Sequence, residues 1–171
     1  PANHQQANLE CNEKPKTGHP VGAYGHPWGF SYTGTKGIIS GITSEFSSEY
    51  LQTDAPINSG NSGGPLISLR TGNVLGINTS KYDADEDQNT NFAELMIYAC
   101  RVLKLLQEGE DPVPPKLPLA YLREPSNDFE LVISESYLIP DLIEFKSGDK
   151  IIQVIGHGPV KNEAQLVHAL R

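Results

Sequence analysis

One turn-rich hexapeptide, Gly60-Asn61-Ser62-Gly63-Gly64-Pro65, contains the residues best suited to covalent chemistry. A nucleophilic serine has to project its hydroxyl from a tight turn, with a backbone N–H directed at the developing oxyanion. Glycines beside the serine permit the backbone angles that such a turn requires and let a substrate approach closely. We therefore predict Ser62 as a nucleophile, with the backbone N–H groups of Gly60 and Ser62 as oxyanion donors. The alternative is a glycine- and serine-rich loop without chemistry.

Short strands and turns surround this hexapeptide and must position it. Strands are predicted over residues 21–25, 50–54, 66–69 and 74–79, with a bent strand pair over residues 33–43. The 16 glycines and 13 prolines favour many tight turns, as in all-β folds. A helix follows, in which Ala99, Val102, Leu103 and Leu106 form one apolar face. Gly109 and Pro112 predict its end.

A proline-rich linker over residues 110–118 divides the chain. Beyond it, strands are predicted at residues 130–134 and 150–155, with a turn at residues 147–149 between them. Asn162 is the predicted cap of a last helix, and Gln165 completes a capping box with it. The domains predicted on this basis are residues 1–109, the linker, and residues 119–171.

Composition limits the classes of partner. The 13 basic and 21 acidic side chains leave a formal net charge of −8, which argues against nucleic acid as a partner. No apolar run approaches the roughly 18 residues of a transmembrane helix. The chain begins at Pro1 and its single methionine is Met96, so we interpret it as part of a longer or processed protein. Cys11 and Cys100 can form one disulfide or remain free. Two cysteines alone do not make a disulfide framework, which favours free thiols.

Spacing suggestive of calcium binding occurs in the acidic segment after the strand predicted over residues 74–79. The oxygen-bearing residues at EF-hand loop positions are Asp83, Asp85, Asp87, Asn89, Asn91 and Glu94. Gln88 stands where the EF-hand loop needs glycine, and a strand rather than a helix precedes the segment. We predict a solvated loop and no metal site. The glycosylation sequon Asn78-Thr79-Ser80 is predicted to be unused, because it lies on a strand.

The run from Gln52 to Leu66, followed by Gly76-Ile77-Asn78-Thr79, resembles the HtrA/Deg family of serine proteases. Residues 21–30 and 35–40 are similar to the second barrel of that family's chymotrypsin-like double β-barrel, and they occur in the right order. The resemblance covers roughly residues 20–107. It implies a mostly β fold in which residues 1–109 form the C-terminal part of a trypsin-like protease domain.

Residues 119–171 resemble a PDZ domain, a module that the HtrA/Deg family attaches after the protease. The Gly148-Asp149 turn before a strand that ends at Gly156 carries most of this likeness. A further strand would be needed after the last helix, so the resemblance implies an incomplete PDZ-like α+β domain. The segment near residues 119–122 departs from the usual glycine-rich carboxylate-binding loop. The alternative is a structural α/β appendage.

The resemblance also assigns roles to individual residues. Ser62 corresponds to the nucleophile, and Gly60 and Ser62 to the oxyanion-hole donors. Thr79, Ser80 and Lys81 correspond to the strand edge on which an extended substrate lies. The loop over residues 81–91 corresponds to a mobile loop that helps to switch the site on.

The residue six positions before the serine corresponds to the base of the primary specificity pocket. Here it is Pro56, which has no charge for a basic substrate side chain. Ile57 and Ile77 are predicted to line a modest apolar pocket. The family usually has asparagine, proline and alanine where this chain has His26, Ser59 and Pro56, which affects loop geometry more than chemistry.

The base and acid that a serine nucleophile needs are not evident in the sequence. In the chymotrypsin-like order both precede the serine, in the first barrel. His19 and His26 precede Ser62 but fall in second-barrel segments, and we interpret them as loop histidines. We therefore predict that the first barrel, with its histidine and aspartate, is outside this chain and that the chain alone is inactive.

The function implied by the resemblance is ATP-independent hydrolysis of unfolded or damaged proteins through an acyl-enzyme on Ser62, with no cofactor. Family habit implies a homotrimeric parent protein in the periplasm, or alternatively in an organelle. The alternative from another class is a non-catalytic peptide-binding or scaffold protein, a pseudoprotease with a PDZ module. A histidine and an aspartate upstream of Pro1 would discriminate between the two.

Overall fold

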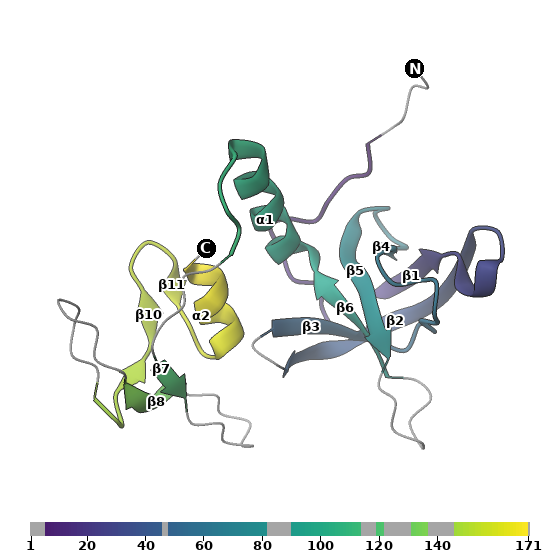
Figure 1. The fold of residues 1–171 in the computed structure, drawn as a ribbon. Helices are drawn as coiled ribbons and strands as arrows, with labels where there is room; N and C mark the ends of the chain where they lie inside the picture. The colour runs from purple at the N-terminus through teal and green to yellow at the C-terminus, as the bar shows by residue number, and fades with distance from the viewer. Residues whose placement is uncertain are drawn as a thin grey trace. The chain divides into compact units, whose positions relative to one another are not determined.

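The computed structural model describes residues 6–45, 48–81, 90–113, 119–121, 131–136 and 146–170. The chain divides into two compact units, of which the first comprises residues 1–43 and 49–110 and the second residues 44–48 and 111–171 (Figure 1). Residues 114–118 of the predicted linker and residues 82–89 of the predicted acidic loop lie outside the described residues. Within the described part of the chain, no helix is long and apolar enough to cross a membrane.

A closed six-stranded barrel forms the first unit (Figure 1). Its strands are β1 (Pro20–Gly25), β2 (Thr33–Glu45), β3 (Ser48–Thr53), β4 (Pro65–Ser68), β5 (Val74–Lys81) and β6 (Asn91–Leu95). Around the barrel the order is β1-β2-β3-β6-β5-β4, and every pairing with a described register is antiparallel. This architecture agrees with the predicted mostly β fold.

The barrel interior is filled by side chains that alternate along the strands. Burial follows every second residue in β4 and β6, as the pleat of a strand requires, whereas Val21, Gly22 and Ala23 of β1 are all buried. The buried apolar residues of this core are Val21, Ala23, Ile39, Leu51, Ala55, Ile57, Leu66, Leu75, Ala93 and Leu95. Full burial of one such leucine contributes about 1.5–3 kcal/mol relative to exposure.

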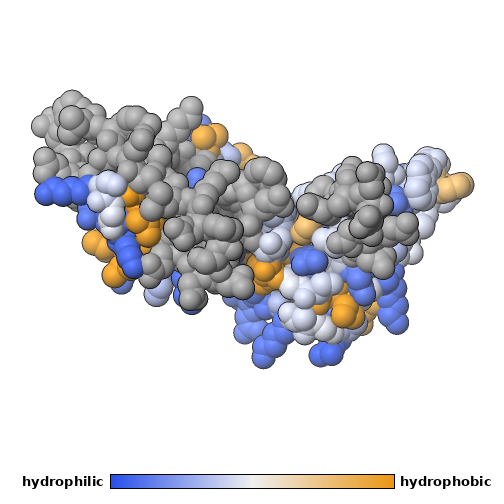
Figure 2. Space-filling model, turned by 90° about the horizontal axis from the view of Figure 1, so that it is seen from below, coloured by the Kyte–Doolittle hydropathy of each residue, from blue (hydrophilic) through white to orange (hydrophobic). Residues whose placement is uncertain are grey.

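On the face shown in Figure 2, apolar side chains lie in separate patches among hydrophilic ones.

Residues 33–43 form one long strand, so the predicted bent strand pair is wrong. Gly37 of this strand lies in close contact with the backbone of Ala55 and is not part of a turn. A Cβ at Gly37 would lie 2.4 Å from the backbone nitrogen of Ala55. The N–H of Ile38 also donates to the Asp54 carboxylate at 2.6 Å. The glycine therefore allows the residues after β3 to pack directly against β2.

Helix α1 (Met96–Glu108) leaves the barrel directly from β6 and ends as predicted, with Gly109 in a left-handed conformation. Its first turn packs on the barrel, since Met96 is buried and Ile97 and Tyr98 contact the core. The predicted apolar face is not buried in this unit, because Leu103 and Leu106 are exposed. The apolar periodicity predicted the helix correctly, but it did not predict that the first turn of the helix is the part that is buried.

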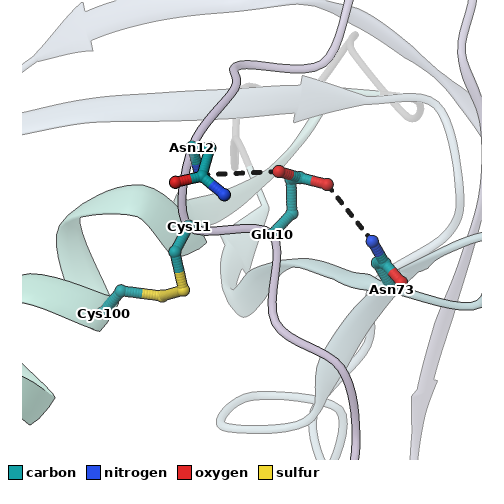
Figure 3. The surroundings of a disulfide bond; sticks show 5 residues. All are labelled: Glu10, Cys11, Asn12, Asn73 and Cys100. Atoms are coloured by element: carbon teal, nitrogen blue, oxygen red, sulfur yellow. Dashed lines mark hydrogen bonds between the residues drawn. A yellow bond between two sulfur atoms is a disulfide. The ribbon is translucent and has the colours of Figure 1, made fainter.

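The segment before β1 is attached to the barrel and to α1. Glu10 donates its N–H to Val74 O at 2.9 Å, and Val74 donates to Asn8 O at 2.8 Å. A disulfide joins Cys11 to Cys100 of α1 across 89 residues of sequence (Figure 3). The preference for free thiols was therefore wrong. Only the tertiary fold brings the two cysteines together, with their Cα atoms 5.8 Å apart.

A second attachment involves charge. Glu49 is buried and forms an ion pair with Lys14, and it also accepts a hydrogen bond from the Tyr98 hydroxyl. The Lys14 ammonium lies 5.5 Å from the centre of the Tyr98 ring. Burial, together with the Glu49 carboxylate, raises the pKa of Tyr98 well above its ordinary value. Tyr98 therefore keeps its phenolic proton and donates a hydrogen bond at neutral pH.

A hydrogen-bonded turn holds His19 at the opposite end of β4 from the Ser62 turn. The Ser68 hydroxyl oxygen accepts the N–H groups of Arg70 at 3.2 Å and Thr71 at 3.1 Å. Its own proton is therefore donated to Nε2 of His19, 2.7 Å away. This arrangement requires a neutral imidazole. Burial lowers the pKa of His19 below 6.5, and the positive charge of Arg70 adds to the effect.

The pH dependence of stability follows from this shift. As the pH falls below 6.5, His19 of the unfolded chain takes up a proton before the folded one does. The free energy of unfolding is therefore expected to decrease until the pH reaches the lowered pKa. An NMR titration of the His19 ring measures that pKa, and Arg70→Gln is expected to raise it. A folded-state pKa at or above 6.5 would contradict the prediction.

The second unit contains two small sheets and a helix. A three-stranded sheet has β8 (Leu131–Ser136) between β7 (Leu119–Tyr121) and β9 (Lys150–Ile151). Strands β10 (Gln153–Val154) and β11 (Gly158–Pro159) form a hairpin, and α2 (Glu163–Ala169) follows. Leu131, Val160 and Leu166 make its core. The strand predicted over residues 150–155 is thus interrupted, and Ile152 between its two parts is exposed.

The predicted cap of α2 is present. The Asn162 side chain accepts the N–H of Gln165 at 2.9 Å. The Gln165 side chain accepts the N–H of Lys161 at 2.8 Å, one residue before the position expected for a capping box. The final residue, Arg171, lies outside the described residues.

Candidate active site

Two successive tight turns carry Ser62 into β4. Asn58 O accepts the N–H of Asn61, and Asn61 O accepts the N–H of Gly64, each at 2.9 Å. The loop is also attached to β5, because Gly63 donates to Asn78 O and Asn78 donates to Gly64 O, each at 2.8 Å. Ser62 is exposed at the outer end of this loop. Its backbone position is therefore held from both sides while its hydroxyl remains accessible.

Glycine is required at two positions of this loop. Gly60 has φ +103°, and a Cβ there would lie 2.3 Å from the carbonyl oxygen of His26. A Cβ at Gly64 would lie 2.1 Å from the carbonyl oxygen of Tyr24. Both contacts are with backbone, so neither could be relieved by a side-chain rotation. The end of β1 and the loop after it therefore pack directly on the Ser62 turn.

Backbone polar groups surround the Ser62 hydroxyl. The hydroxyl donates to Thr79 O at 2.7 Å. Among the described residues, the backbone N–H groups of Gly60 and Ser62 are donated to no acceptor. Two N–H groups from a turn of this kind can stabilise an oxyanion that forms on a carbonyl attacked by Ser62.

Two buried amides support the turn, and the sequence analysis did not identify them. Asn78 donates its side-chain amide to Tyr24 O at 3.3 Å and to Pro65 O at 3.2 Å, joining β5 to β1 and β4. Asn61, immediately before Ser62, is 1% exposed. Within the described part of the chain, the amide oxygens of both residues are buried without a hydrogen-bond partner. The available signal at Asn78 was a polar amide that directly follows the apolar run Val74-Leu75-Gly76-Ile77.

The strand edge predicted to receive a substrate lies beside Ser62. The register of β5 with β4 ends at the Ile77–Pro65 pair, whereas its register with β6 continues to Lys81 and Asn91. On the β4 side, residues 79–81 of β5 therefore extend beyond the end of β4. The side-chain hydroxyl of Thr79 donates to Phe92 O of β6 at 3.2 Å. The backbone carbonyl of Thr79 accepts the hydrogen bond from Ser62. The side chains of Ser80 and Lys81 lie outside the description.

The residues predicted to form the specificity pocket differ in exposure. Pro56 is exposed, and its carbonyl accepts the Thr35 hydroxyl at 2.7 Å. Ile57 is 3% exposed and belongs to the barrel core, with its N–H donated to the Asn91 side chain at 3.1 Å. Ile77 is half-buried on β5. A pocket lined by these residues stays a prediction.

Neither histidine that precedes the nucleophile is hydrogen-bonded to it. His19 is bonded to Ser68, and Nδ1 of His26 lies 3.3 Å from Phe30 O. His157 and His168 are in the second unit, and His4 lies outside the described residues. The structure thus brings together Ser62, Gly60 and Thr79, and it places His19 and His26 in other hydrogen bonds.

Comparison with known proteins identifies the class first. Residues 1–77 match the family model of the trypsin-like peptidase domain. The solved structure titled "HtrA-type protease AlgW with tripeptide" superimposes with a TM-score of 0.73, covering 96% of this chain and 60% of that one. Sequence identity to it is 24%, so this likeness establishes the fold. It confirms the predicted second barrel of a chymotrypsin-like protease followed by a partial PDZ-like domain.

Curated relatives then show what the chain is similar to within that class. The chain is 49% identical over 71 residues to a protein of Pseudomonas fluorescens described as "Probable periplasmic serine endoprotease DegP-like", covering 39% of the chain and 15% of the relative. It is 38% identical over 111 residues to serine endoprotease DegS of Escherichia coli, covering 59% and 31%. The chain thus spans less than a third of either relative. These matches confirm the relationship to the HtrA/DegP family of serine proteases.

Proposed function

We propose that this chain supplies the nucleophile-bearing barrel of a serine endopeptidase that hydrolyses unfolded or damaged proteins without ATP. The observation that supports this most directly is the geometry at Ser62. An exposed hydroxyl, two undonated backbone N–H groups and an open strand edge meet at one turn. Relatives described as serine endoproteases support the same class of reaction.

The mechanism follows from these groups. An extended substrate lies along residues 79–81 of β5, with the residues before the scissile bond on this edge. Ser62 exchanges its hydrogen bond to Thr79 O for one to a base, and its oxygen attacks the scissile carbonyl carbon. The N–H groups of Gly60 and Ser62 stabilise the oxyanion, and the amine leaves with the proton held by the base. Water then hydrolyses the acyl-enzyme.

The base and its orienting acid come, in this proposal, from a first barrel outside these 171 residues. The parent protein is proposed to be a homotrimer, as the family resemblance implies. An extracytoplasmic compartment is proposed because the Pseudomonas relative is described as periplasmic and because disulfides such as Cys11–Cys100 persist under oxidising conditions. An oxidising organelle is the alternative.

Degradation of a denatured protein tests the proposal. Purified full-length protein is incubated with denatured casein and with folded, disulfide-intact lysozyme, in the absence of ATP. We expect casein to be degraded and lysozyme to be spared. Casein that stays intact under conditions in which the full-length protein is folded would refute the proposal.

The cleavage sites report on the specificity pocket. Pro56 provides no carboxylate for a lysine or arginine side chain, so cleavage is expected after small or medium apolar residues such as Val, Ala and Ile. Sequencing of the casein products by mass spectrometry measures this preference. Pro56→Asp is expected to shift cleavage toward lysine and arginine. Dominant cleavage after basic residues in the unsubstituted protein would show that the pocket is misassigned.

A second candidate is a peptide-binding protein without catalysis. It is favoured by one observation: the Ser62 hydroxyl is bonded to Thr79 O, while His19 and His26 are bonded to other groups. The complete open reading frame discriminates between the candidates. A histidine followed by an aspartate upstream of Pro1, together with casein hydrolysis, supports the peptidase, whereas peptide binding without hydrolysis supports the second candidate.

A further inference from the structure

The loop between β1 and β2 exposes three large aromatic side chains. Trp28, Phe30 and Tyr32 are 69%, 64% and 61% exposed. Trp28 is part of a short 3-10 helix, η1 (Pro27–Gly29), and all three residues lie within one five-residue stretch. Aromatic side chains concentrated in this way on a surface are typical of binding sites, since they bury large areas with few rotatable bonds. We call Trp28, Phe30 and Tyr32 the aromatic loop.

Ring packing holds the base of the aromatic loop in place. The Tyr24 ring packs over Gly34 and Gly22, where a Cβ would lie 2.5 Å and 2.8 Å from ring atoms. Tyr32 stacks on Tyr24 with 5.6 Å between ring centres and 12° between planes. The His26 ring meets Tyr32 edge-on at 5.6 Å. The base of the loop is therefore ordered by ring packing before any ligand arrives.

Trp28 has an unusual backbone conformation. Its φ of 52° and ψ of 26° are left-handed, and it is the only non-glycine residue with positive φ among the described residues. That conformation is unfavourable for a bulky side chain. The indole is mostly exposed, so packing within the barrel does not account for it. The unfavourable backbone conformation of Trp28 therefore places a large apolar side chain in solvent.

The aromatic loop is built onto the turn that carries the oxyanion donor. His26 donates its N–H to Gly60 O at 2.9 Å, and Trp28 donates to Ser59 O at 3.3 Å. Strand β4, which follows Ser62, pairs with β1 on one side and β5 on the other. The loop after β1 and the Thr79 edge of β5 therefore lie on opposite sides of the Ser62 turn. A peptide that enters along β5 and passes Ser62 leaves toward the aromatic loop.

We propose that the aromatic loop binds an aromatic or large aliphatic side chain within the first three residues after the scissile bond of the substrate. This inference rests on the proposed peptidase function and adds a specificity determinant to it. The occupant is a segment of an unfolded polypeptide, because only an extended chain can contact the β5 edge and the aromatic loop together. Such segments expose the side chains that a folded protein buries.

Matched substrates test the proposal on the full-length protein. Peptides share one scissile bond and carry either Phe or Ser at the first, second or third residue after it. We expect kcat/KM to be about tenfold higher with Phe at one of these positions, the change that 1.4 kcal/mol of apolar contact produces. The double variant Trp28→Gly with Phe30→Ser is expected to lose this preference, so that its kcat/KM values for the Phe and Ser peptides become equal.

The variants separate recognition from folding. Glycine suits the left-handed conformation of residue 28, so Trp28→Gly is expected to keep or raise the thermal midpoint. Leu69→Ala removes another exposed apolar side chain of the same unit, just after the end of β4 that is remote from Ser62, and is expected to retain the Phe preference. A Phe preference that persists in the double variant, or that Leu69→Ala also abolishes, overturns the proposal.

A binding measurement keeps the proposal independent of turnover. Trp28 is the single tryptophan of the 171-residue chain, so its emission reports on the aromatic loop directly. The Phe peptide is expected to shift this emission to shorter wavelength in the Ser62→Ala chain, whereas the Ser peptide is not. If the full-length protein hydrolyses nothing but this shift occurs, the peptidase proposal fails and the binding site stands. If the shift is absent, the binding site is refuted.

Discussion

Replacing Ser62 by alanine in the full-length protein is expected to lower kcat/KM for casein-derived peptides by about 10⁴- to 10⁶-fold. The covalent route disappears with the hydroxyl, whereas Gly60 N–H and the β5 edge remain available for binding. The KM is therefore expected to change little compared with kcat. A serine-directed phosphonate should label Ser62 in the unsubstituted protein and leave the variant unlabelled. Ser62→Ala with undiminished activity would eliminate the assignment.

Two comparisons make this result specific. Ser40→Ala removes an exposed serine hydroxyl on β2 of the same barrel and is expected to keep full activity and labelling. The 171-residue chain by itself is expected to show no measurable hydrolysis of casein, because His19 and His26 are engaged with Ser68 and Phe30. Hydrolysis by this chain alone, lost in His19→Ala or His26→Ala, would show that the base is internal.

Loss of the Cys11–Cys100 disulfide is expected to destabilise the barrel by about 4 to 5 kcal/mol. The bond closes a loop with a sequence separation of 89 residues, which restricts the unfolded chain strongly in the loop-entropy description. Cys11→Ser combined with Cys100→Ser removes the bond without leaving a free thiol. Amide hydrogen exchange in β4 and β5 is expected to be about a thousandfold faster in the most protected positions, where exchange requires global opening.

The controls for this prediction use the reductant. Dithiothreitol is expected to accelerate exchange in the unsubstituted chain and to have no effect on the double variant. The hydrogen bonds of Glu10 with Val74 and the Lys14–Glu49 ion pair also hold the segment that carries Cys11. Lys14→Met is therefore expected to increase the effect of the reductant. Equal exchange with and without dithiothreitol in the unsubstituted chain would show that the bond is absent or contributes nothing.

The sequence by itself predicted those features that depend on neighbouring residues. The turn around Ser62 follows from local glycines, Gly109 ends α1, and Asn162 caps α2, since each of these depends on the conformation of a few consecutive residues. The resemblance of residues 20–107 to a protease family added the expected barrel class and the prediction that a substrate lies along the Thr79 edge. The mostly β class followed from the same local patterns.

Tertiary structure decided what depends on distant residues. The turn of α1 that is buried depends on how β6 leads into the helix. The place of Ile57 in the core depends on the closure of the barrel. Cys11 and Cys100 meet because the segment before β1 lies along Val74. The aromatic loop borders Ser62 because β4 pairs between β1 and β5. Strand pairing and side-chain packing of this kind join residues far apart in the chain, and a local pattern of residue types carries no information about which of them meet.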